Sequence, residues 1–247
     1  MKQMIKGLMP LSTIKGLMVN RNRQAGACVA CLDSNSVDGL CHACRSDLPI
    51  NRWCCRLCCL PLATQSQELT CGDCLKAPPP YDRSRIPWRY QYPIDGMISR
   101  YKYSGQRKFA RPLIQDMCGY LKEQLDGCER GHPDLLVPAP MHPAKRRKRG
   151  FNQARDIAEH LSRTLGIPLD TNLVYRTRHT PAQQGLNRAQ RLANLADVFA
   201  VKGKVPERVA IVDDVVTTGA TARLLASRLK EAGALDVEVW ALARTPA

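Results

Sequence analysis

The segment Val209–Thr221 reads VAIVDDVVTTGAT and sets two adjacent carboxylates, Asp213 and Asp214, behind an apolar run. Two valines follow the carboxylates, and then a cluster of threonine and glycine residues. An apolar run of this kind predicts a buried strand, and the polar cluster predicts a turn after it. Because ligands in open α/β sheets bind beyond the carboxyl ends of strands, we expect the two carboxylates to face a ligand.

The residues after the carboxylates are typical of a phosphate-binding loop. They lead into an expected helix, and the first N–H groups of a helix lack partners and carry partial positive charge. A glycine lets the backbone approach a phosphate, and threonine hydroxyls add donors. A sugar phosphate suits both features, because its vicinal ribose hydroxyls would donate to Asp213 and Asp214. The 5′-phosphate loop would then consist of Val215, Val216, Thr217, Thr218, Gly219, Ala220 and Thr221. No Gly-Lys-Ser/Thr sequence follows, which excludes a Walker loop.

The cysteines indicate two metal sites near the N-terminus. Ten of the twelve cysteines lie between Cys28 and Cys74 and include four Cys-x2-Cys pairs. Two such pairs complete a tetrahedral zinc shell and leave no position for water, so we expect two structural zinc ions. The expected ligands are Cys28, Cys31, Cys41 and Cys44 for one ion and Cys55, Cys58, Cys71 and Cys74 for the other. A disulfide framework is the alternative, and Cys54 or Cys59 could replace a ligand of the second set.

The composition is that of a basic globular chain. It has 247 residues, 44% of them hydrophobic, and no apolar run long enough to cross a bilayer. Charged residues interrupt the N-terminal segment and argue against a signal peptide, so we expect a cytoplasmic protein without membrane insertion. The formal charge of +15 falls to about +11 when eight thiolates bind two zinc ions. Between Met141 and Arg191, eleven Lys and Arg residues stand against three Asp and Glu residues, which favours a polyanionic partner such as single-stranded DNA.

The periodicity after the cysteines predicts a parallel sheet flanked by helices. Apolar runs at 135–140, 209–214 and 236–242 predict strands. Helical spacing of apolar residues at 154–165 and 221–232 separates them, and this alternation implies an α/β fold. We expect an N-terminal tail at 1–26, a double zinc ribbon at 27–76, a Pro-rich linker at 77–87 and an α/β domain at 88–247. Because the ribbons would take most of their folding energy from zinc, chelation would unfold them and spare the α/β domain.

All thirteen residues of Val209–Thr221 fit the phosphoribosyl pyrophosphate signature of type I phosphoribosyltransferases, which the segment closely resembles. With the cysteine pairs, the VPAP sequence at 137–140 and RGFNQ at 149–153, the chain resembles the ComF family of bacterial competence proteins, including GntX-like members, over residues 27–247. The resemblance implies a type I phosphoribosyltransferase fold behind a double zinc ribbon. It also implies a link to DNA uptake and use, with proteins of DNA uptake as partners.

The resemblance also implies roles for residues outside the signature. Arg149, in RGFNQ, would bind the pyrophosphate, Lys102 would belong to a hood over the site, and Arg176 to a mobile flap. These three are the expected catalytic residues. Lys145–Lys148 either contribute ligands to the pyrophosphate loop or form a solvated face. The flap would also contain Thr177, Thr180, Gln183, Gln184, Arg191 and Asn194. Mg²⁺ would bind together with phosphoribosyl pyrophosphate, mainly through oxygens of that ligand.

Two classes of function are open at this point. The first is a phosphoribosyltransferase, a pentosyl-transferring glycosyltransferase that serves DNA uptake or nucleotide metabolism. The second is a non-catalytic nucleic-acid-binding or scaffold protein of DNA uptake that uses the fold to sense a ligand. The complete signature favours a functional phosphoribosyl site. No segment indicates a nucleobase pocket, so the acceptor is not identified.

Overall fold

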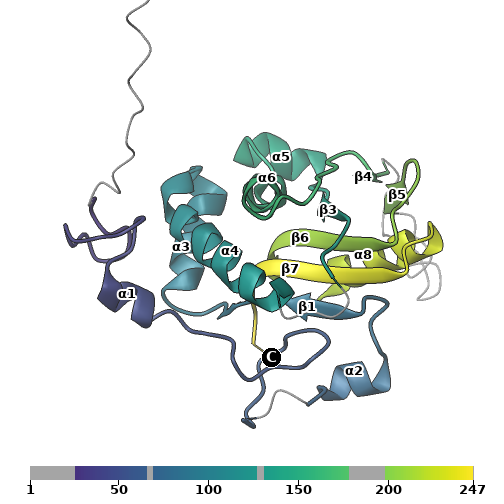
Figure 1. Cartoon of the computed structure of the whole chain (residues 1–247). Helices are drawn as coiled ribbons and strands as arrows, with labels where there is room; N and C mark the ends of the chain where they lie inside the picture. Colours follow the sequence, from purple (N-terminus) through teal and green to yellow (C-terminus); the bar gives the residue numbers. More distant parts are fainter. Residues whose placement is uncertain (1–25, 66–68, 127–130, 178–197, 247) are drawn as a thin grey trace, which may run out of the picture.

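The computed structural model describes residues 26–65, 69–126, 131–177 and 198–246. Its centre is a five-stranded sheet in which all paired strands run parallel (Figure 1). The strands follow the spatial order β1, β7, β6, β3, and β2 pairs with the end of β7. Their bounds are Arg83–Arg85 for β1, Trp88–Arg89 for β2, Leu135–Pro138 for β3, Arg208–Val216 for β6 and Asp236–Arg244 for β7. The predicted α/β class is confirmed.

Helices cover both faces of this sheet (Figure 1). The long helices are α3 (Ile94–Ser104), α4 (Arg111–Asp126), α6 (Gln153–Leu165) and α8 (Ala220–Glu231). Val212 and Trp240 belong to a core shared with α3, α4 and α6, whereas Ile211 and Val239 belong to a core shared with α8. Because side chains alternate along a strand, these neighbours point to opposite faces. Among the described helices, none is long and apolar enough to cross a membrane.

Short elements complete the described chain. They are α1 (His42–Ser46), α2 (Gly72–Lys76), the 3-10 turn η1 (Arg107–Phe109), α5 (Pro143–Arg149), β4 (Val174–Arg176) and β5 (Phe199–Val201). β4 and β5 pair antiparallel in a sheet of their own. Residues 178–197 lie between these two strands in the sequence and outside the described residues. The expected flap residues Thr180, Gln183, Gln184, Arg191 and Asn194 therefore cannot be placed.

β6 extends further than the sequence indicated. Val215 and Val216 continue the strand and pair with Ala243 and Arg244 of β7, so the two carboxylates lie within the last residues of β6. Valine suits this position because its branched side chain is stiff and favours extended backbone. The turn itself is only Thr217–Gly219. The seven residues expected to form one loop are therefore divided between a strand, a turn and the start of α8.

The segment expected to be a linker contributes a strand to the sheet. β1 lies inside 77–87 and pairs with Glu238–Trp240 of β7. Nε of Arg85 lies 2.8 Å from Oε2 of Glu238, and both side chains are nearly buried. The segment that follows the cysteines is thus joined to the sheet by main-chain hydrogen bonds and an ion pair. The division of the chain into domains at these boundaries stays a prediction.

Candidate functional site

Two acidic side chains and one lysine meet near the carboxyl end of β6. Asp214 is buried, and its Oδ1 lies 2.8 Å from Nζ of Lys102 in the last turn of α3. The exposed fractions of the two side chains are only 11% for Asp214 and 14% for Lys102. Charges shielded from water attract each other more strongly than exposed ones. Lys102, expected in the hood, therefore contacts one of the two expected ribose-binding carboxylates directly.

Asp213 is half-buried beside this ion pair. Burial raises the pKa of Asp213 to about 7, and the negative charge of Asp214 adds to the shift, while Lys102 and Arg149 oppose it. Oδ1 of Asp213 accepts a hydrogen bond from the backbone N–H of Asp214 at 2.8 Å. A carboxyl group close to its pKa at neutral pH can accept a hydrogen bond from a hydroxyl or donate one to it. The two residues thus have the chemistry to hold a pair of vicinal hydroxyl groups.

The RGFNQ sequence forms a turn that fixes Arg149 near the strand ends. The guanidinium of Arg149 lies 5.0 Å from the ring centre of Tyr103 in α3. Gly150 follows with φ of 80°, a left-handed conformation that glycine adopts without strain and that ends α5. The side chain of Asn152 then caps α6, and its amide donates to the carbonyl of Ala139 at 3.1 Å. The charge of Arg149 is consequently close enough to Asp213 to lower the pKa of that carboxyl group.

The basic residues before Arg149 form the helix α5, where the resemblance implied a loop. The side chain of His142 caps this helix by accepting from the backbone N–H of Ala144 at 3.2 Å, and Pro143 occupies the first turn. Proline suits that position, and lysine and arginine favour a helix, so the local sequence explains the difference. Lys145–Lys148 are all exposed. Whether these residues are pyrophosphate ligands or a solvated cationic face stays a prediction.

The turn Thr217–Gly219 leads directly into α8. Gly219 adopts φ of 77° and immediately precedes the helix, whose first N–H groups have no partners within the helix itself. Thr217 and Thr218 are exposed, so their hydroxyl groups are accessible. Nη1 of Arg244 donates to the carbonyl of Val216 at 3.1 Å and also to that of Thr217. The sequence alone did not identify Arg244 as a functional residue. The only indication in the sequence was that a basic residue ends an otherwise apolar strand.

Arg176 lies in the two-stranded sheet that β4 and β5 form. It ends β4, and its guanidinium lies 4.9 Å from the ring centre of Phe199 in β5. Burial lowers the pKa of Arg176, and its buried Nε has no hydrogen-bond partner among the described residues. The described contacts of Arg176 do not include Asp213 or Asp214. Its expected role as part of a flap therefore stays a prediction, and it is the one expected catalytic residue that does not join the cluster.

Two cysteine quartets form in the N-terminal region, with the members that the spacing predicted. They are Cys28, Cys31, Cys41 and Cys44, called the first quartet below, and Cys55, Cys58, Cys71 and Cys74, called the second quartet. Within each quartet the sulfur atoms lie within 4.8 Å of one another. Sγ of Cys31 lies 3.6 Å from Sγ of Cys41, and Sγ of Cys58 lies 3.6 Å from Sγ of Cys71. Zinc–sulfur bonds of about 2.3 Å in a tetrahedron require sulfur atoms about 3.8 Å apart. Each quartet can therefore hold a structural zinc ion.

The remaining described cysteines belong to neither quartet. Sγ of Cys59 donates to the carbonyl of Ser84 at 3.1 Å, and Cys54 lies near it. Within the described residues, no cysteine forms a disulfide. Cys54 and Cys59 thus lie outside the metal sites, and the regular Cys-x2-Cys spacing alone identifies the two quartets.

Known proteins match this chain along most of its length. Competence protein F of Haemophilus influenzae is 32% identical over 223 residues, which cover 88% of this chain and 96% of that protein. The DNA utilization protein YhgH of Escherichia coli is 34% identical over 226 residues, which cover 85% of this chain and 99% of that protein. Competence protein ComFC of Streptococcus pneumoniae is 30% identical over 166 residues, or 65% of this chain and 67% of that protein. No family model matches the chain.

Two solved structures also match. A purine phosphoribosyltransferase from Pyrococcus horikoshii shares 21% identity, with a TM-score of 0.34 over 54% of this chain and 70% of that chain. A glutamine phosphoribosylpyrophosphate amidotransferase from B. subtilis shares 20% identity, with a TM-score of 0.38 over 57% of this chain and 30% of that chain. At such scores the likeness concerns the type of fold alone and carries no argument about function. The sequence relatives decide the family, because two of them match nearly end to end: the chain belongs to the ComF family of competence and DNA-utilisation proteins.

Proposed function

We propose that this chain binds phosphoribosyl pyrophosphate, or a related sugar phosphate, and acts as a phosphoribosyltransferase in DNA uptake or use. The observation that carries the proposal is the cluster of Asp213, Asp214, Lys102 and Arg149 beside the turn Thr217–Gly219. The carboxylates match vicinal hydroxyls, the turn matches a 5′-phosphate, and the cations match a leaving pyrophosphate. The names of the sequence relatives support the biological process, with proteins of DNA uptake as proposed partners in the cytoplasm.

Each side chain of the cluster has a distinct part in binding. Asp213 and Asp214 would hold the ribose hydroxyls, while the hydroxyls and N–H groups of Thr217–Gly219 would hold the 5′-phosphate. Lys102, 2.8 Å from Asp214, orients that carboxylate and adds positive charge to the cluster. Arg149, whose guanidinium lies 5.0 Å from the ring centre of Tyr103, would bind the leaving pyrophosphate. Mg²⁺, bound mainly through ligand oxygens with carboxylate oxygens nearby, would supply further electrostatic stabilisation of the leaving group.

The reaction is a displacement at C1′ of the ribose. The bond between C1′ and the pyrophosphate oxygen breaks, and its electron pair leaves with pyrophosphate. The ribose gains oxocarbenium character, and an acceptor then forms the new bond to C1′. Negative charge grows on the leaving group only in the transition state, so a prepositioned Arg149 stabilises that state more than the bound substrate.

Each cysteine quartet would hold one structural zinc ion. The four thiolates fill the tetrahedral shell and leave no position for water or substrate, so the metal would support the fold and take no part in the reaction. The sulfur separations of 3.6 Å support this proposal, because they are close to the edge of a zinc–thiolate tetrahedron.

A second function, nucleic-acid binding without turnover, is favoured by a different observation. α5 exposes four consecutive cations, Lys145–Lys148, directly before Arg149. Exposed cations in a row attract the phosphate backbone of single-stranded DNA in a sequence-independent way. In this case the sugar-phosphate site would sense a ligand, and no bond at C1′ would break.

Pyrophosphate release distinguishes the two functions. The assay contains Mg²⁺ and phosphoribosyl pyrophosphate, with and without single-stranded DNA, across a panel of bases and amines. Arg149→Ala should lower turnover by about 10²–10³ and weaken ground-state binding much less. Arg155→Ala is the matched control, since Arg155 is exposed on α6 and pairs with Glu159 at 2.8 Å; its rate should equal that of the parent. Binding of DNA without release under any condition would favour the second function.

A further inference from the structure

We propose that the second quartet positions the turn Thr217–Gly219 through Arg244 and Arg223, so that metal at this quartet is required for an ordered phosphate loop. Metal at the first quartet has no such effect. The consequence for sugar-phosphate affinity rests on the proposed function, whereas the ordering of the turn does not. Arg244 and Arg223 are positioning residues, because they act on the backbone and helix that carry the turn.

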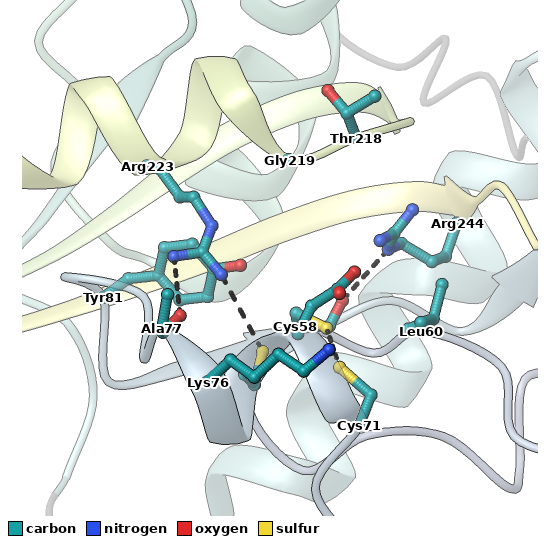
Figure 2. A pocket seen from close by; sticks show the side chains of 12 residues that line it. Cys58, Leu60, Cys71, Lys76, Ala77, Tyr81, Thr218, Gly219, Arg223 and Arg244 are labelled. Carbon is teal, nitrogen blue, oxygen red and sulfur yellow. Dashed lines mark hydrogen bonds between the residues drawn. The ribbon is translucent and has the colours of Figure 1, made fainter. Parts of the chain in front are cut away.

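Arg244 connects the second quartet to the turn through one buried side chain, and Figure 2 shows its bond to Cys58. Only 6% of the residue is exposed. Its Nε donates to the carbonyl of Cys58 at 3.1 Å, and its Nη1 donates to the carbonyls of Val216, at 3.1 Å, and Thr217. A guanidinium is planar and rigid, so these bonds share one geometry. A displacement of Cys58 would therefore move or break the bonds that hold the start of the turn.

Arg223 makes a second connection, from the first turns of α8. Its Nη1 donates to the carbonyl of Ala77 at 3.1 Å, and its Nη2 lies 4.0 Å from Sγ of Cys74 (Figure 2). The backbone N–H of Arg223 donates to the carbonyl of Gly219 at 2.9 Å. Hydrogen bonds to a metal-bound thiolate orient the ligand and adjust its charge. The quartet is thus linked both to the beginning of the turn, through Arg244, and to its end, through Arg223.

The charges around the second quartet balance when the quartet holds a zinc ion. A cavity of about 320 Å³ lies between the quartet and the turn, and its charged lining residues are Asp73, Lys76, Arg223 and Arg244. A zinc ion with four thiolates carries a charge of about −2, which together with Asp73 offsets the three cations. No cation of this cavity is left over for a second anionic ligand. Loss of the metal would remove the negative charge next to Arg223, whose Nη2 lies 4.0 Å from Sγ of Cys74.

The first quartet lies on the other side of the sheet. Cys28 and Cys41 belong to the core with α3, α4 and α6, whereas the second quartet belongs to the core with α8. Arg45 of α1 forms an ion pair with Asp116 of α4. Figure 1 shows α1 beside α3 and α4, and α2 on the far side of β1. Emptying the first quartet should therefore disturb α4 and leave the start of α8 unchanged, which makes this quartet an internal control.

Hydrogen–deuterium exchange of the full zinc-loaded chain tests the coupling without any ligand. Cys71→Ser, which disrupts the second quartet, should raise exchange in peptides covering residues 216–221, and Cys31→Ser should not. Arg244→Lys and Arg223→Gln keep all eight cysteines; both should retain the zinc content of the parent and still raise exchange in these peptides. Arg228→Gln is the matched control, because Arg228 lies on the same helix and pairs with Glu231 at 2.7 Å.

Titration with ribose 5-phosphate extends the test to binding. Loss of the hydrogen bonds from Arg244 should weaken affinity about tenfold, the equivalent of about 1.4 kcal/mol. A parent chain that binds no ribose 5-phosphate would contradict the proposed function. The exchange experiment would still test whether the second quartet orders the turn Thr217–Gly219. Unchanged exchange at 216–221 in both Cys71→Ser and Arg244→Lys, or an equal increase in Cys31→Ser, would overturn it.

Discussion

Asp213 and Asp214 are adjacent in the sequence, yet their surroundings give them opposite effects on stability. Asp214 pairs with Lys102 at 2.8 Å, so its charge is compensated. Burial and the charge of Asp214 raise the pKa of Asp213 to about 7, so ionised Asp213 is disfavoured in the folded chain. A buried charge without full compensation costs stability, and such costs are common where a site must hold a ligand. The two carboxylates therefore predict different results for the same substitution.

Asp213→Asn should stabilise the chain at alkaline pH. The folded pKa of about 7 exceeds the unfolded value of about 3.9, so the folded state binds more protons between these values. The stability conferred by protonated Asp213 is fully present below pH ~4 and is lost as pH rises through about 7. The gain from asparagine should grow by about 2–3 kcal/mol between pH 5 and pH 8, measured by urea unfolding. Glu123→Gln, an exposed change on α4, should show no such growth.

Asp214→Asn should destabilise the chain instead. It leaves the ammonium group of Lys102, 14% exposed, without its partner, at a cost of about 1–3 kcal/mol. Both asparagine variants should weaken binding of phosphoribosyl pyrophosphate by about 1.5–3 kcal/mol, as expected for charge-assisted hydrogen bonds. Unfolding curves and binding isotherms of the two variants check this contrast. Equal stability of the two variants at pH 8 would contradict the assigned pairing.

α5 shows how local propensity decides a short element. The resemblance implied a loop before Arg149, but His142, Pro143 and Gly150 provide a cap, a first turn and an end for a helix. The helix places Lys145–Lys148 in solvent. The most direct test of α5 therefore removes several of its charges together, as for a cationic surface, and does not treat each side chain as a separate ligand.

Removing charges from α5 should reduce the salt dependence of DNA binding. Each phosphate contact with single-stranded DNA contributes about −0.7 to the slope of log affinity against log salt. Alanine at Arg146, Arg147 and Lys148 should flatten that slope by up to about 2. Alanine at Lys122, Arg163 and Lys204, which are exposed outside α5, removes the same charge and should leave the slope nearly unchanged. Equal slopes for the two variants would assign α5 to a simple solvated face.

At the scale of the whole molecule, the cysteine region and the sheet are one connected structure. β1 pairs with β7, Arg244 bonds to Cys58, and the second quartet shares a core with β6, β7 and α8. The sequence suggested ribbons that unfold independently when zinc is removed. The shared core and the paired strand change this expectation, because metal at the second quartet supports contacts made by the sheet itself.

Chelation should therefore weaken the α/β part as well as the ribbons. Elemental analysis should find about two zinc ions per chain, one for each quartet. A strong chelator should lower the melting temperature and raise amide exchange in β1 and β7, and addition of zinc should reverse both effects. If exchange increases only in residues 26–65 and 69–76 while β1 and β7 stay protected, the ribbons unfold independently of the sheet.

Several features follow from the sequence because they depend on neighbours in the chain. The Cys-x2-Cys pairs identified both quartets, since two residues between cysteines are enough to direct two sulfurs to one point. The alternation of apolar runs identified the parallel sheet, since side-chain periodicity reflects burial directly. The signature Val209–Thr221 identified a strand with two carboxylates, then a turn and a helix, although the strand continues through Val216. These patterns need no knowledge of how distant segments pack.

The tertiary structure alone decided which distant residues meet. Lys102 and Asp214 are separated by more than a hundred residues, and only the packing of α3 over the sheet brings them to 2.8 Å. The end of β6 was set by pairing with β7, a contact that the strand's own residues do not specify. No sequence motif identified Arg244. Its role depends on tertiary packing, which brings the carbonyls of Cys58 and Val216 within hydrogen-bond distance of one guanidinium. Local sequence predicts elements and ligand sets, whereas long-range packing determines which of them act together.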